Sequence, residues 1–269
     1  LLGTISQSGE TADTLEALKA AKQINSSVKS LCISNSAESS LTRLSDLTFL
    51  THAGPEIGVA STKAFTTQLV SLALLVCSLG KLKNTIDKKQ EKEIVIGLKK
   101  LPGLINKALL QEPQIKKLSK QLQSKNSALF LGRGTMHAIA MEGALKLKEI
   151  SYIHATGYAA GELKHGPIAL IDSKLPVVCI APNTSTYEKM ISNIQEVKSR
   201  KGKVIAVATE GNQDIQKTAD DVIYIPNITE ELTPLLVAIP LQLLAYYIAI
   251  KLDCDVDQPR NLAKSVTVE

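Results

Sequence analysis

The two halves of this sequence repeat the same order of segments at an offset of roughly 174 residues, and this repeat constrains the fold more than any other feature. In each half an apolar run is followed by a hydroxyl-rich turn, an amphipathic helical pattern, two further apolar runs and a long apolar helical pattern. The paired segments are 1–6 with 177–181, 7–11 with 183–186, 14–24 with 187–198, 30–34 with 203–209, 47–50 with 221–225, and 61–79 with 231–252. Strands that alternate with helices in this way predict parallel sheets covered on both faces. We therefore expect an α/β protein with two three-layer domains related by duplication.

The second half contains a strand pattern, 128–132, and a helical pattern, 135–150, that have no partner in the first half. Their counterparts would lie before Leu1, so we expect the sequence to be a fragment whose first domain lacks its opening strand and helix. A Lys-rich helical stretch, 88–123, joins the halves, and Pro102 and Pro113 are expected to interrupt it. The predicted division is a first domain at 1–120, a second at 121–252 and an irregular C-terminal tail at 253–269.

Composition excludes several classes of protein. Hydrophobic residues make up 44% of the chain, enough for real cores, whereas aromatic residues make up 3% and Trp is absent, which argues against a base-stacking nucleic-acid surface. The four cysteines are far apart and form no metal-binding spacing, so they indicate free thiols in a reducing compartment, the cytoplasm. The apolar stretches 69–79 and 235–250 contain polar residues or Pro, and neither predicts a membrane span; no signal peptide is evident.

The first hydroxyl-rich turn predicts a phosphate site. Ser6, Ser8 and Thr11 surround Gly9 between a strand and a helix. The first amides of a helix are unpaired and attract anions, and glycine lets the backbone approach closely. The alternative is that Ser8 or Thr11 only caps the helix.

A second group of polar residues has the chemistry for proton transfer. Glu142, Lys146 and Glu149 fall on one face of the helical pattern at 140–150, although a surface ladder of ion pairs has the same spacing. His165 lies between a helical pattern and a Gly-Pro turn, the setting of an accessible acid–base group, while a lone His is more often structural. The tail from Asp253 has no periodicity, which fits either a frayed terminus or a lid.

Five motifs together resemble one family along the whole chain: Ser6–Thr11, Glu56–Phe65, Glu142–His154, Gly161–Pro167 and Asp257–Glu269. The sequence is similar to the C-terminal isomerase half of glucosamine-6-phosphate synthases, the glutamine:fructose-6-phosphate amidotransferases. That half consists of two sugar isomerase (SIS) domains, in agreement with the duplication.

The resemblance implies a role for each candidate site residue. Catalytic roles fall to Glu149 as the base between C1 and C2, His165 in ring opening across a subunit interface, Lys264 as the Schiff-base amine, and Lys146 and Glu142 in support. Substrate binding falls to Ser6, Gln7, Ser8 and Thr11 on the phosphate, and to Val59, Ala60, Ser61 and Ala263 on the sugar.

The resemblance also implies the reaction and the partners. Fructose 6-phosphate and glutamine would give glucosamine 6-phosphate and glutamate in amino-sugar synthesis, with no metal and no cofactor. A homodimer and an N-terminal glutaminase domain, which is not in this chain, would be the partners, with no nucleic acid or membrane. Alone, the chain would only interconvert fructose 6-phosphate and glucose 6-phosphate.

Two alternatives stay open. A regulatory module could bind a sugar phosphate on the same fold without catalysis, but such a module has no use for Glu149, His165 and Lys264 together. A related deaminase or isomerase could lack any glutaminase half.

Overall fold

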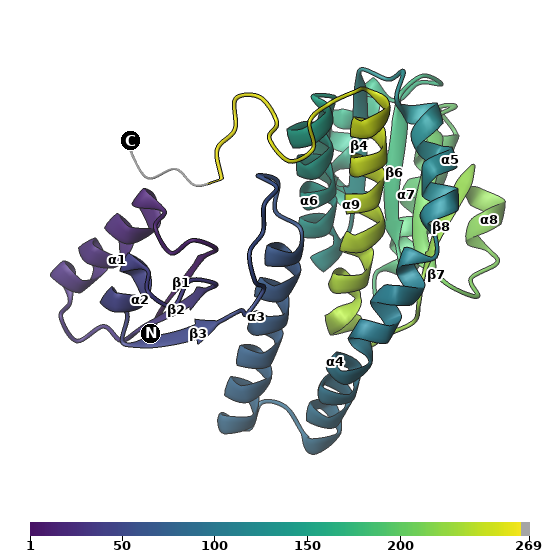
Figure 1. The fold of residues 1–269 in the computed structure, drawn as a ribbon. Helices are drawn as coiled ribbons and strands as arrows, with labels where there is room; N and C mark the ends of the chain where they lie inside the picture. Colours follow the sequence, from purple (N-terminus) through teal and green to yellow (C-terminus); the bar gives the residue numbers. More distant parts are fainter. Residues whose placement is uncertain (265–269) are drawn as a thin grey trace. The chain divides into compact units, whose positions relative to one another are not determined.

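The computed structural model describes residues 1–264, which form two compact units (Figure 1). The first unit contains residues 1–85 together with the tail from Arg260, and the second contains Ile86–Pro259. The stretch that joins the two halves of the repeat therefore packs with the second unit. The expected domain limits at residues 120 and 252 stay predictions.

The first unit is built on a parallel sheet of three strands in the order β1-β2-β3. The strands are β1 (Leu2–Ser6), β2 (Ser30–Ser34) and β3 (Leu47–Leu50), and the helices are α1 (Ala12–Ile24), α2 (Ser40–Leu44) and α3 (Lys63–Leu82). The central strand β2 is buried along its whole length, as expected of a strand covered on both faces. Leu18, Cys32 and Leu41 form the core between the sheet, α1 and α2.

The second unit is built on a parallel sheet of five strands in the order β5-β4-β6-β7-β8. The strands are β4 (Ser127–Gly132), β5 (His154–Ala159), β6 (Pro176–Ala181), β7 (Lys203–Thr209) and β8 (Asp221–Ile225). The α-helices are α4 (Lys88–Leu109), α5 (Glu112–Leu122), α6 (Thr135–Ser151), α7 (Tyr187–Lys198), α8 (Ile215–Thr218) and α9 (Thr233–Lys251). Three short 3-10 helices are η1 (Ala160–His165), η2 (Pro167–Leu170) and η3 (Glu230–Leu232).

Neighbouring residues of β4 face opposite sides of this sheet, and both sides are covered by helices (Figure 1). Leu129 and Leu131 belong to the core cluster that includes Ile194 of α7. Phe130 points to the other side, where α6 packs against α9. A Cβ on Gly143 would lie 2.8 Å from a Leu241 methyl carbon and 3.1 Å from the Phe130 ring. The helices and the sheet therefore meet at van der Waals contact, which leaves no space for a side chain at Gly143.

The predicted fold class is confirmed, and the duplication appears in the strand orders. The order β1-β2-β3 in the first sheet repeats as β6-β7-β8 in the second. The sheet of the second unit also contains β4 and β5, which have no counterpart among the described residues of the first unit.

The prediction that Pro102 interrupts the joining stretch is wrong. Pro102 lies inside α4, which continues to Leu109. Proline removes one helical hydrogen bond, but Leu101 and Ala108 are buried and α4 packs against α9, so tertiary packing offsets the loss. Pro113 does mark a break. It lies in the first turn of α5, where the backbone N–H that proline lacks would have had no acceptor within the helix.

The strand β5 was not predicted as a strand. Its sequence is rich in small residues. Gly157 is required by packing, because a Cβ there would lie 2.6 Å from the Met141 Cα of α6. The close approach of α6 therefore favours small residues in β5 over the β-branched residues on which strand prediction depends.

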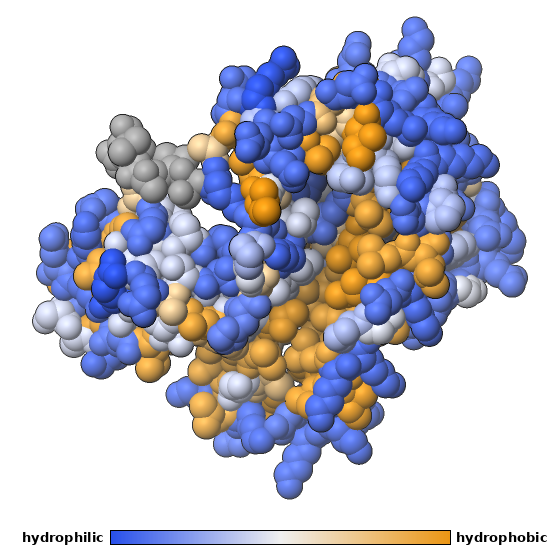
Figure 2. Space-filling model, in the orientation of Figure 1, coloured by the Kyte–Doolittle hydropathy of each residue, from blue (hydrophilic) through white to orange (hydrophobic). Residues whose placement is uncertain are grey.

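Two helices, α3 and α9 with η3, are long and apolar enough to cross a membrane by length and composition alone. Within the most apolar window of each helix, 61% of the α9 residues are buried, as in a core helix, whereas 17% of the α3 residues are buried. Figure 2 shows hydrophobic side chains gathered along α3, and its exposed apolar residues are Leu74, Val76, Leu79 and Leu82.

All four cysteines are free thiols, as predicted. Cys32, Cys77 and Cys179 are buried, and burial raises the pKa of Cys179 and Cys32, which makes these two thiols poor nucleophiles. Cys254 is partly exposed.

Candidate functional site

The turn after β1 forms a small cradle of hydroxyls and backbone amides in the first unit. The Ser6 Oγ and Thr11 Oγ1 atoms are 2.9 Å apart, and the Gly9 N–H donates to Ser6 Oγ at 3.0 Å. The Glu10 N–H donates to Ser8 Oγ at 3.2 Å. Ser6 is the last residue of β1, so the cradle lies at the carboxyl end of a parallel strand, where open α/β sheets bind ligands.

The helix-capping alternative finds no support at Thr11. Thr11 occupies the N-cap position of α1, but its side chain makes no capping hydrogen bond. It faces Ser6 instead. The first amides of α1 are therefore not satisfied by this residue, which leaves donors for an anion.

Gly9 is required by the shape of the cradle, because its φ angle is +71° and a Cβ would lie 2.0 Å from Ser39 Oγ. Ser39 caps α2, so it has little freedom to move. We expect Gly9→Ala to lower the free energy of unfolding by more than about 2 kcal/mol through strain and steric overlap. Urea denaturation measures this change.

The matched control for Gly9 is Gly54→Ala. Gly54 has nearly the same φ, +68°, but nothing lies within 4 Å of its added Cβ. Backbone strain alone is expected to cost about 1–2 kcal/mol there. Equal losses in the two variants would show that overlap with Ser39 has no part in the effect at Gly9.

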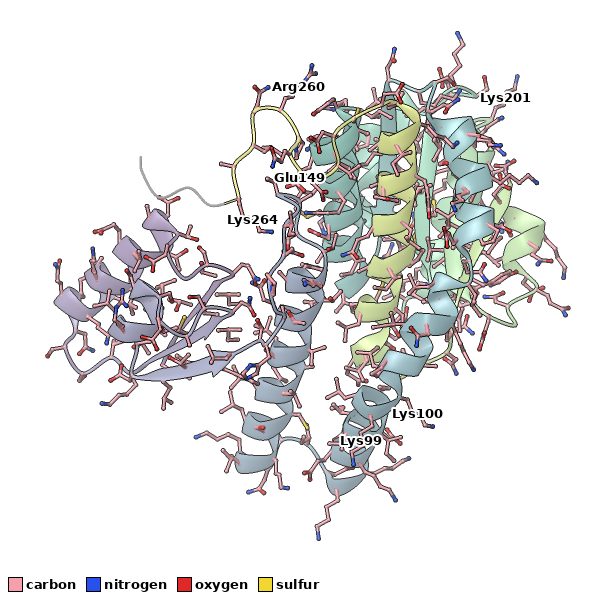
Figure 3. The ribbon with its side chains drawn as sticks, in the orientation of Figure 1. Lys99, Lys100, Glu149, Lys201, Arg260 and Lys264 are labelled. Atoms are coloured by element: carbon pink, nitrogen blue, oxygen red, sulfur yellow. The ribbon has the colours of Figure 1, made fainter. Side chains whose placement is uncertain are left out.

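The segment predicted to line the sugar lies between β3 and α3. Val59 and Ser61 are partly buried, and Ala60 is 9% exposed. In the same unit, Lys264 Nζ lies 2.9 Å from Glu56 Oε2 and donates to the Gly58 carbonyl oxygen at 2.5 Å. The structure thus brings the predicted amine next to the predicted sugar-lining segment (Figure 3).

Ala263 precedes Lys264 and is exposed. The predicted tail extends from 253 to 269, and its last five residues lie outside the described part of the chain.

The carboxylate and lysine face of α6 is buried, so it is not a surface ladder. Lys146 is 4% exposed, and its Nζ lies 2.6 Å from Glu149 Oε2 and 3.6 Å from Glu142 Oε1. Among the described residues, these two carboxylate oxygens accept no hydrogen bond of good geometry. The positive charge of the Lys146 ammonium is therefore the main group that stabilises their negative charge.

One ammonium between two carboxylates leaves one negative charge in excess if both acids ionise. Burial raises the pKa of Glu142, and the neighbouring Glu149 charge adds to this, while attraction to Lys146 opposes it. The raised pKa of Glu142 favours its protonated form, and a buried acid of this kind beside a second carboxylate and a cation is typical of functional sites. The face has the chemistry of a proton-transfer site.

His165 is the last residue of η1 and is exposed. Gly166 follows it with a φ of +141°, a conformation that side chains rarely adopt, and this turns the backbone after the imidazole. His165 and the α6 residues Glu142, Lys146 and Glu149 belong to the second unit, whereas the phosphate cradle, the sugar-lining segment and Lys264 belong to the first. Within each unit the predicted residues have the geometry described here. The assembly of both sets into one site stays a prediction.

The hydroxyl-rich turn of the second half is used differently from its counterpart. In the second unit, Ser185 donates from its backbone N–H and its hydroxyl to the two carboxylate oxygens of Glu230, at 2.9 and 2.7 Å. A carboxylate of the same unit thus already takes these donors. Of the two turns, the one at residues 6–11 is the better candidate for a phosphate.

A hollow of about 580 Å³ in the second unit lies elsewhere, at the amino ends of β4 and β5. Its lining includes His154, Asp172 and Lys174 but none of the predicted site residues. Because ligands of open α/β sheets bind at the carboxyl ends of strands, size alone does not make this hollow the active site.

Glu56 is the residue that sequence reasoning missed. It lies in a motif that carries the family resemblance, but its partner Lys264 is 208 residues away in sequence, so no local pattern connects the two. A carboxylate just before a long helix was the available signal, since anions are favoured at helix N-termini.

Comparisons with known proteins agree on one family. The SIS domain matches residues 2–78 and 121–252. The chain is 55% identical over 269 residues to glutamine--fructose-6-phosphate aminotransferase (isomerizing) of Pseudomonas putida, and 52% identical to that of Escherichia coli. In both cases all of this chain is covered, and it spans 44% of the relative's length.

A solved structure supports the same comparison. The C-terminal domain of glucosamine-fructose-6-phosphate aminotransferase from Francisella tularensis matches with a TM-score of 0.91 and 47% sequence identity. The match covers 96% of this chain and 73% of that one.

Proposed function

We propose, from the premise that this chain belongs to the SIS domain family, that it is the sugar-phosphate isomerase part of a glucosamine-6-phosphate-forming aminotransferase. Its substrate is fructose 6-phosphate. The phosphate binds at Ser6, Gln7, Ser8 and Thr11, and the sugar lies along Val59, Ala60, Ser61 and Ala263. The observation that carries the proposal is the buried face on which Lys146 lies between Glu142 and Glu149.

The chemistry follows from the residue types. His165 moves a proton during opening of the cyclic ketose, since imidazole titrates near neutral pH. The Lys264 amine condenses with the C2 carbonyl, and the resulting Schiff base makes the neighbouring C1–H more acidic. Glu149 takes that proton and returns it at C2, which converts the ketose into the aldose. Glu142 and Lys146 keep Glu149 in place, and the Lys146 ammonium offsets the negative charge of the carboxylates.

The whole protein would use glutamine as the nitrogen source. Fructose 6-phosphate and glutamine give glucosamine 6-phosphate and glutamate, and a glutaminase domain outside this chain supplies the ammonia. The chain alone is therefore proposed to interconvert fructose 6-phosphate and glucose 6-phosphate without glutamine hydrolysis.

We also propose a cytoplasmic homodimer, in which the exposed His165 of one subunit serves the site of the other. The free thiols agree with a reducing compartment.

The proposal is tested with the purified protein, in the longest form that its gene encodes. Incubation with fructose 6-phosphate, without glutamine, is expected to form glucose 6-phosphate, which a coupled dehydrogenase assay measures. Binding of fructose 6-phosphate without any conversion would identify a regulatory binding module instead. Release of ammonia from glucosamine 6-phosphate, with no transfer from glutamine, would identify a deaminase.

A further inference from the structure

The carboxylate of Glu56 connects two parts of the first unit that are far apart in sequence. Its side chain is 5% exposed. Oε1 accepts the Thr62 N–H at 2.9 Å, the Thr62 hydroxyl at 3.2 Å and the Ala64 N–H at 3.2 Å, which are groups at the start of α3. Oε2 accepts from Lys264 Nζ at 2.9 Å. Both oxygens of this buried acid therefore accept hydrogen bonds.

Glu56 stays ionised across the neutral range. Burial raises its pKa, but hydrogen bonds from Thr62, Lys264 and Ala64 outweigh burial, so the net pKa lies below the usual value. The carboxylate also lies at the N-terminus of α3, where an anion is favoured. Its negative charge is thus available to a cation at any pH where the protein would work.

The lysine side of the contact is equally specific. Lys264 Nζ has a second acceptor, the Gly58 carbonyl oxygen at 2.5 Å, and its side chain is 36% exposed. Gly58 directly precedes Val59–Ser61. The amine is therefore fixed beside the sugar-lining segment by two acceptors while it remains reachable from solvent.

We propose that Glu56 is the positioning residue for Lys264: it holds the terminal amine beside the sugar-lining segment and remains its counter-ion during Schiff-base formation. This inference rests on the proposed function.

The charges balance through the reaction. The ammonium and the C2 ketone lose one water and give a protonated imine: the C–O double bond is replaced by a C–N double bond, and the oxygen leaves with two protons from nitrogen. The positive charge is the same before and after, so Glu56 faces a cation both at the start and at the end of this step. The ammonium must give up a proton before its nitrogen can attack, and that proton returns with the departing water. A purely structural role for Glu56, at the start of α3 alone, would not affect these steps.

The first test is Glu56→Gln in the full-length protein. Glutamine has the shape of glutamate but no charge, and its amide cannot serve as a counter-ion. Borohydride reduction in the presence of fructose 6-phosphate traps the Schiff base, and mass spectrometry of the peptide that contains Lys264 measures it. The rate of trapping is expected to fall by about 10²-fold, because a misplaced reacting group costs about that much. The KM for fructose 6-phosphate is expected to change little, since the phosphate cradle is untouched.

Asp46→Asn is the matched control. Asp46 also accepts a backbone N–H and a hydroxyl, both from Ser30, at 2.9 and 2.7 Å, and it pairs with Lys22 at 3.4 Å in the same unit. It touches none of the predicted site residues in these contacts. Its loss is expected to reduce stability without any change in trapping. Equal loss of trapping in both variants would overturn the role of Glu56.

Two further measurements keep the outcome decisive. Glu56→Asp retains the charge with a shorter reach and is expected to recover part of the trapping rate. The rate of trypsin cleavage after Arg260 measures how firmly the tail is bound to the first unit, independently of any reaction with the sugar. Cleavage is expected to be faster in Glu56→Gln than in the unsubstituted protein. Unchanged cleavage would overturn the positioning role. If the unsubstituted protein traps no sugar on Lys264, the proposed function itself fails, whatever the cleavage shows.

Discussion

Replacing Glu149 with glutamine is expected to lower the rate of fructose 6-phosphate isomerisation by about 10²–10⁴-fold, the usual contribution of a general base. Glutamine fits the same space but cannot take the proton from C1. Binding of fructose 6-phosphate should be nearly unchanged, because the phosphate cradle lies on another unit of the chain. The loss should therefore appear in kcat rather than in KM.

Glu196→Gln is the control for this loss. Glu196 lies in the same unit, its side chain is 22% exposed against 21% for Glu149, and it pairs with Lys164 at 2.9 Å. Its substitution removes a carboxylate of similar burial, paired with a lysine that is 63% exposed, and this carboxylate has no proposed role in catalysis. Full activity in Glu149→Gln, or an equal loss in Glu196→Gln, would remove Glu149 from its role as the base.

The second large effect is expected in stability. Lys146→Met should lower the free energy of unfolding by about 3–5 kcal/mol, since removal of one member of a buried charge cluster leaves the other charges uncompensated. Methionine keeps most of the apolar length, so the loss measures the charge rather than packing. Glu142 and Glu149 would then lie next to each other with no cation between them. Urea denaturation measures the change.

Lys217→Met provides the comparison. Lys217 pairs with Asp214 at 2.7 Å with the same three-residue spacing as Lys146 and Glu149, but both side chains are more than three-quarters exposed. An exposed pair contributes about 1 kcal/mol at most. If Lys146→Met cost no more than this, the two acids would have to be neutral in the folded protein, and the proton-transfer role of the cluster would need a different charge state.

The elements that could be predicted from the sequence were those with a strong period. The helix at 187–198 and the strand at 221–225 lie where they were expected, and the predicted repeat agrees with the matching strand orders β1-β2-β3 and β6-β7-β8. The failures have a physical cause in each case. Tertiary contacts compensate for Pro102 within α4, and close packing on α6 explains the glycine within β5.

The candidate site was predictable only where its residues are close in sequence. The spacing of Glu142, Lys146 and Glu149 placed them on one helix face, but it gave no information on burial, which separates a proton-transfer cluster from a surface ladder. The pair of Glu56 and Lys264 depends on a contact between distant segments, and periodicity carries no signal of such a contact.

The return of the C-terminal tail to the first unit has a consequence for incomplete polypeptides. The chain leaves that unit after Thr85 and rejoins it only at Arg260, so Lys264 is separated by the whole second unit from the rest of its own unit in sequence. A polypeptide cut at this junction would keep the hydroxyl turn and both sheets and would lack Lys264. Under the proposed function, such a remnant would bind the sugar phosphate without converting it.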